Sequence, residues 1–77
     1  MKEFAIRLAS VQEVQEFVAL ATAQTFPVFV RDRYIQVNGK NFMEMFCLNF
    51  ATPLIATADC GEEQLLQLLK LMQNFLA

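Results

Sequence analysis

Few side chains in this sequence can do chemistry, and the most versatile type is missing. The chain has 77 residues and no histidine, so it offers no imidazole base, no phosphohistidine and no His-bound metal. Its two cysteines, Cys47 and Cys60, are too few for a structural zinc site, and we interpret them as small buried hydrophobic residues. A single disulfide between them is the less favoured alternative. We expect no metal and no cofactor.

The remaining polar groups form no known catalytic pattern. A paired-carboxylate site from Glu13, Glu16 and Glu44 would need a cleft to shift their pKa values, and the sequence indicates none. The basic residues that could bind an anion are best explained as ordinary surface charge; they are Arg7, Arg31, Arg33 and Lys40. Phosphate-binding loops, Cys-x-x-Cys pairs and nucleophile elbows are all absent. We expect that the chain is not an enzyme.

Bulk properties narrow the class of protein further. Apolar residues make up 56% and charged residues 18%, which predicts one folded domain over residues 1–77. A net charge of −2 argues against nucleic-acid binding. The longest uncharged stretches, Phe17–Val30 and Met45–Ala58, are shorter than the roughly 18–20 residues that span a bilayer. We expect a cytoplasmic protein with no membrane association.

Hydrophobic spacing predicts seven elements in the order β-α-β-β-α-β-α, an α+β fold. The expected strands are the alternating segment Phe4–Leu8, then Thr25–Val30, Arg33–Val37 and Leu54–Ala58, and the expected helices are Val11–Ala23, Asn41–Leu48 and Gly61–Phe75. Ser10 stands three residues before Glu13, and Asn41 three before Glu44, which is the spacing of capping boxes. Arg31-Asp32 is expected to be a hairpin turn, and Gly39 is free to take a positive φ.

This element order resembles the HPr-like family, whose type member is the phosphocarrier of the bacterial sugar phosphotransferase system. The resemblance covers essentially the whole chain and is carried by four segments. They are the strand–helix start Phe4–Val18, the hairpin, the run Val37–Phe46 and the Leu-rich final helix. It implies an open-faced β-sandwich, in which a four-stranded antiparallel sheet carries its helices on one face.

The resemblance also shows what the chain lacks. The family's phosphorylated histidine lies in a Leu-His-x-Arg-Pro motif at the start of the first helix, which matches about Ser10 here, with Gln12 and Glu13 at the Arg and Pro positions. The family's regulatory serine matches about Asn41. Serine has no nitrogen nucleophile, no base is visible beside Ser10, and Asn41 cannot be phosphorylated. The resemblance therefore implies a degenerate member without phosphocarrier chemistry.

The family's docking surface is retained. It implies an apolar cluster on the short second helix, formed by Phe42, Met43 and Phe46 with Met45 turned inward. A helix this short has one inward face, so some of these side chains must be exposed or covered by a partner. The first helix would contribute Val11, Gln12 and Gln15. We expect a regulatory protein that binds another, unidentified protein.

Two alternatives stay open at this point. A phosphotransferase-system component could still be phosphorylated on a hydroxyl, for which Ser10 is the candidate. A structural homo-oligomer, such as a homodimer, could instead use the sheet face opposite the helices, where strand alternation puts Phe29, Tyr34 and Ile55.

Overall fold

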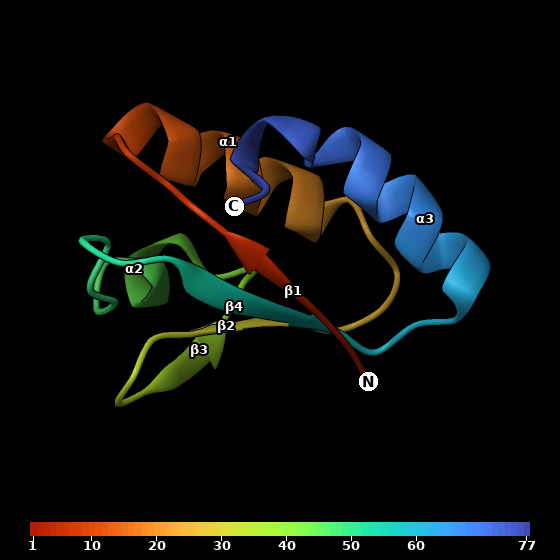
Figure 1. Cartoon of the computed structure of the whole chain (residues 1–77), viewed down its shortest axis with the longest axis horizontal. Coiled ribbons are helices and arrows are strands. Elements are labelled where there is room, and N and C mark those ends of the chain that lie inside the picture. The colour runs from red at the N-terminus through yellow and green to blue at the C-terminus, as the bar shows by residue number, and fades with distance from the viewer.

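The computed structural model describes residues 1–77 and contains the expected elements in the expected order. They are β1 (Lys2–Ile6), α1 (Val11–Thr22), β2 (Val28–Arg31), β3 (Gln36–Asn38), α2 (Phe42–Met45), β4 (Leu54–Ala58), α3 (Glu62–Leu71) and a short 3₁₀ helix, η1 (Gln73–Phe75). The strands form one antiparallel sheet in the order β1-β4-β2-β3. Helices α1 and α3 lie over one face of the sheet, and α2 lies toward one end (Figure 1). The predicted α+β fold is confirmed.

The sheet has one apolar face because alternate residues of each strand point the same way. Val28 and Val30 of β2 and Ala56 of β4 are fully buried. Their neighbours Phe29 and Ile55 point to the other face and are half-buried. The apolar face meets the helices in a core of 17 buried hydrophobic residues.

The helices close this core through a few large side chains. Phe17 of α1 is fully buried, and its ring meets that of Phe75 edge to face, with centroids 6.4 Å apart and an interplanar angle of 72°. Leu68 and Met72 complete the contact from the C-terminal side and are also fully buried. Leu66 and Leu71 remain exposed, so only one face of α3 joins the core.

The hairpin between β2 and β3 differs from the expected two-residue turn. The strands pair only as far as Arg31 with Gln36, and residues 32–35 form the loop. The Asp32 carboxylate holds this loop, because its Oδ1 accepts the backbone N–H groups of Tyr34 (2.7 Å) and Ile35 (2.9 Å). This Asx-type turn is compatible with the longer loop.

Gly39 has a role other than the expected one. No glycine in the structure has a positive φ. A Cβ at position 39 would instead lie 3.0 Å from Val28 Cγ1 and 3.1 Å from the Val28 carbonyl oxygen. The Gly39 N–H donates to that same oxygen at 2.7 Å. Glycine therefore allows the chain after β3 to pass directly against β2.

The C-terminal segment returns to the sheet. The expected final helix becomes a 3₁₀ turn after α3, and Leu76 then forms a β-bridge with Ile6. Hydrogen bonds run from the Arg7 N–H to the Phe75 carbonyl (2.7 Å) and from the Ala77 N–H to the Ala5 carbonyl (3.1 Å). This contact covers part of the free edge of β1. No helix has the length and uncharged apolar character that a bilayer crossing requires.

Candidate functional site

Helix α1 begins with a completed cap at the position where chemistry was considered. Ser10 is the N-cap residue, and its Oγ accepts the Glu13 backbone N–H at 3.2 Å. The Glu13 carboxylate in turn accepts the Ala9 N–H at 2.7 Å. The capping box predicted from the sequence is therefore present. No imidazole, amine or carboxylate bonds the Ser10 hydroxyl, so nothing activates it as a nucleophile.

Helix α2 begins in the same way. The Asn41 Oδ1 accepts the Glu44 N–H at 3.1 Å. The Glu44 carboxylate accepts from the Asn38 N–H and from the Asn41 Nδ2, each at 3.1 Å. Both helix starts therefore hold a carboxylate of the chain itself, in the region where an external anion would seek donors.

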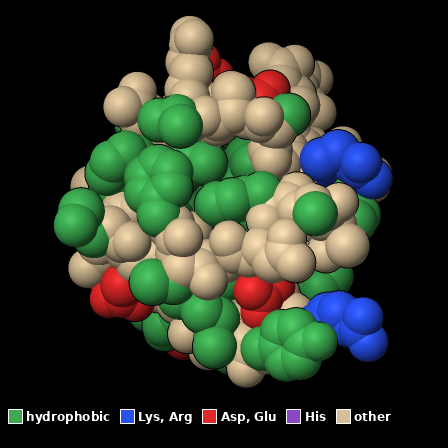
Figure 2. All heavy atoms as spheres, turned by 90° about the vertical axis from the view of Figure 1, so that its left-hand side faces the viewer, with side chains coloured by type: hydrophobic (Ala, Val, Ile, Leu, Met, Phe, Trp, Pro, Cys, Tyr) green, Lys and Arg blue, Asp and Glu red, His purple; other side chains and the backbone are tan.

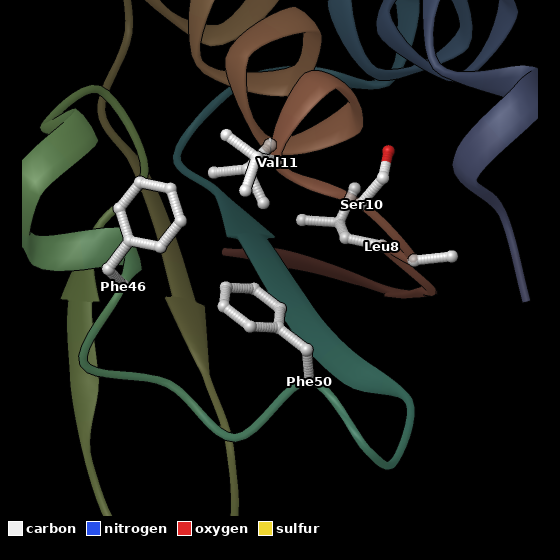
Figure 3. A pocket seen from close by; sticks show the side chains of 7 residues that line it. Leu8, Ser10, Val11, Phe46 and Phe50 are labelled. Atoms are coloured by element: carbon white, nitrogen blue, oxygen red, sulfur yellow. The ribbon is translucent and has the colours of Figure 1, made fainter.

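A pocket of about 260 Å³ lies between the start of α1 and the loop after α2. Seven residues line it: Leu8, Ala9, Ser10, Val11, Val14, Phe46 and Phe50. The rings of Phe46 and Phe50 face the α1 side, whereas the Ser10 hydroxyl oxygen points away from both rings (Figure 3). The pocket is thus an apolar cavity that offers van der Waals contact and almost no polar recognition.

The apolar groups of α2 divide between the core and the surface. Met45 is fully buried, as predicted, and Phe42 is half-buried against the core. Met43 is 77% exposed and Phe46 is 43% exposed. Val11, at the start of α1, is 57% exposed. We call the pocket together with Met43 the α1–α2 surface; apolar side chains gather in one patch on this side of the molecule (Figure 2).

Phe50 belongs to this surface, and sequence reasoning missed it. The Phe46 ring packs edge to face against Phe42 at 4.8 Å and against Phe50 at 6.3 Å. Phe50 lies in the irregular segment between α2 and β4, which has no periodicity that could assign it a face. The only signal available was a phenylalanine four residues after Phe46.

The two glutamines expected beside the cluster are both exposed but differ in position. Gln15 is one helical turn beyond Val11, so the two share a side of α1. Gln12 instead extends along the helix, where its amide lies 3.4 Å from the Glu16 carboxylate. Glu16 lines a second, more open groove of about 390 Å³ between α1 and the C-terminal helices.

The sheet face opposite the helices is more occupied than the sequence suggested. Phe29 and Ile55 lie there, half-buried. Tyr34 does not: the assignment is wrong because Tyr34 belongs to the hairpin loop, where it is 83% exposed. An ion pair between Arg31 and Glu3, with 3.0 Å between Nη1 and Oε2, crosses the face from β2 to β1.

The other candidate groups do not come together. No three Asp, Glu or Cys side chains are arranged to hold a metal ion. Cys47 and Cys60 are free thiols, and Cys47 is exposed rather than buried, because it follows the short α2 on the solvent side. Among the carboxylates, the pKa of Asp32 is lowered, mainly because the backbone N–H groups of Ile35, Tyr34 and Asn49 donate to it.

Comparison with known proteins shows similarity at the level of the fold. No protein-family description matches the sequence, and no curated protein matches it. Among solved structures, the chain is similar to the crystal structure of HPr-C-His from Thermoanaerobacter tengcongensis, with a TM-score of 0.77 and 22% sequence identity. The match covers 96% of this chain and 93% of that one. The chain therefore has the HPr-like fold.

Proposed function

We propose that this protein is an HPr-like protein without phosphohistidine chemistry, which acts as a non-enzymatic, regulatory protein by binding another protein through the α1–α2 surface. The observation that carries the proposal is the exposure of Val11, Met43 and Phe46 around an apolar pocket of about 260 Å³. It would be a relative of the sugar phosphotransferase phosphocarrier that retains a docking surface. The HPr-like fold supports this relation.

The composition of the surface suits protein recognition. Aromatic and Met side chains are enriched in interface cores, and exposed clusters of them mark binding sites more often than isolated apolar residues do. Burying one such side chain against a partner contributes about 1.5–3 kcal/mol. The pocket is smaller than the roughly 300–1,000 Å³ of ordinary ligand sites, so a single bulky side chain of a protein suits it better than a cofactor.

Phosphorylation of Ser10 is less well supported. The Glu13 carboxylate already occupies the Ala9 N–H group at 2.7 Å, and it would repel a phosphoryl group on the neighbouring hydroxyl. Ser10 also has a structural role as the cap of α1. Incubation with the phosphotransfer enzymes and the HPr-directed kinase, followed by intact mass measurement, should show no added phosphate. A phosphorylated Ser10 would revive this alternative.

The proposal is tested by capture from a lysate of the source organism with three baits. The wild type should retain a partner that Met43→Glu loses, because a charge is placed on an exposed side chain at the centre of the surface. Leu66→Glu is the matched control, since Leu66 is 62% exposed on α3, away from the surface. Phe42 is unsuitable for this test because it packs against the core.

The outcome is decisive if all three baits are folded, which circular dichroism establishes. A partner held by the wild type and by Leu66→Glu, but lost by Met43→Glu, supports the proposal. Equal capture by all three baits would overturn it.

A further inference from the structure

We propose that the occupant of the α1–α2 surface is a basic amphipathic helix, which inserts one bulky apolar side chain into the pocket and places Lys or Arg beside it. This inference rests on the proposed function and adds the chemistry of the partner. It is carried by the charges around the pocket and by the kind of backbone that lines it.

Three carboxylates hold the segments that frame the pocket. Glu13 bonds Ala9, which lines the pocket. Asp32 accepts the Asn49 N–H at 3.0 Å, immediately before Phe50. Glu44 lies within α2, two residues before Phe46.

None of these three carboxylates has a cationic partner within the chain. The structure contains two ion pairs, Lys2–Glu62 and Arg31–Glu3, and both lie elsewhere. The Lys40 ammonium is bonded to the Gln24 carbonyl at 2.8 Å, at the far end of α1. Figure 2 shows acidic side chains beside the apolar patch and the Lys and Arg side chains at the margin of this face. The surface therefore combines an apolar centre with uncompensated negative charge, which complements a cationic partner.

The backbone around the pocket selects a helix rather than a strand. The lining residues come from the turn before α1, from α1 itself and from the segment after α2, and none lies in a β-strand. An extended peptide gains its affinity from the free edge of a sheet, and this pocket has none. A helix satisfies its own backbone groups and presents apolar side chains at i, i+3 or i+4 spacing.

The test is selection from a displayed library of helical peptides with a fixed apolar stripe and a randomised polar face. The selection uses the wild-type protein, with counter-selection against Met43→Glu so that only binders of the α1–α2 surface are kept. We expect the enriched polar faces to be rich in Lys and Arg. Enrichment of neutral or acidic faces would overturn the inference and leave the proposed function standing. No Met43-dependent binder at all would count against both.

A selected peptide then measures the charge contribution. The double variant Glu13→Gln, Glu44→Gln keeps side-chain oxygens for both caps and removes two charges next to the pocket. It should weaken binding about threefold to tenfold at low salt, and by less at high salt. The control Glu16→Gln, Glu63→Gln removes two exposed charges farther away, and it should bind within about twofold of the wild type. Equal losses in the two double variants would overturn the inference.

Discussion

The α1–α2 surface and the open face of the sheet both carry large apolar groups, yet they differ in how those groups are completed. On the open face, Phe29 and Ile55 are half-buried, and the Arg31–Glu3 ion pair crosses the strands beside them. At the α1–α2 surface, Met43 is 77% exposed, and no ion pair covers it. The comparison teaches that an apolar composition does not define an interface by itself. The better candidate is the surface whose apolar groups and charges have no partner within the chain.

The largest effect should separate the two sides of helix α2. Met45→Ala removes a fully buried side chain and should lower the free energy of unfolding by about 2–5 kcal/mol. Met43→Ala should change it by no more than about 0.5 kcal/mol, because Met43 contributes little to the core. Urea unfolding of the two variants checks this. Similar losses would mean that Met43 is held by the fold and is not available to a partner.

The second effect concerns the cap of α1. Ser10→Ala should lower the free energy of unfolding by about 1 kcal/mol, because the Glu13 N–H loses its acceptor. Thermal unfolding measures the loss, and partner capture should be unchanged. If capture were abolished while stability stayed the same, the hydroxyl would have a functional rather than a structural role.

The third effect is the pH dependence contributed by Asp32, whose carboxylate links the hairpin to the segment that carries Phe50. Its pKa in the folded protein lies below the usual value of 3.8, because the backbone N–H groups of Ile35, Tyr34 and Asn49 stabilise the charged form. Its contribution to stability is therefore complete at neutral pH, and it is lost as the pH falls below about 4 through the folded pKa.

Asp32→Asn tests this contribution by removing the titrating group. The variant should be less stable than the wild type at pH 7 and closer to it at pH 3. Denaturant unfolding at the two pH values measures both differences. A constant difference in stability would show that the carboxylate charge is not what holds the loop.

The smallest effect should come from the open face of the sheet. Glu3→Gln should cost only about 0.2–1 kcal/mol, because the Arg31–Glu3 pair is exposed on both sides. In sedimentation experiments, the wild type and the variant should both remain monomeric at high concentration. A concentration-dependent dimer that Glu3→Gln weakens would instead favour the homo-oligomer that uses this face.

Local patterns predicted the elements and much of the α1–α2 surface. The pairs Ser10–Glu13 and Asn41–Glu44 specify both caps, and the short length of α2 requires that Met45 and Met43 take opposite sides. These features depend on residues three or four positions apart, so the sequence contains them directly.

Features that depend on distant contacts could not be predicted in this way. Gly39 is needed because Val28 lies against it, and Phe50 joins the surface because Phe46 is beside it in space. Tyr34 was placed on a strand because the sequence does not reveal that the Asp32 side chain closes a longer loop. The α3 helix ends early because residues 75–77 bond to the segment after β1.

The most direct test of the central claim maps the partner onto the protein. Once a partner has been captured, isotope-labelled protein is titrated with it, and the backbone amide signals are followed by NMR. We expect the largest changes in residues 8–15 and 42–50, with small changes in β2 and β4. Changes concentrated on residues 29–31 and 55–57 would contradict the account and assign binding to the open face of the sheet.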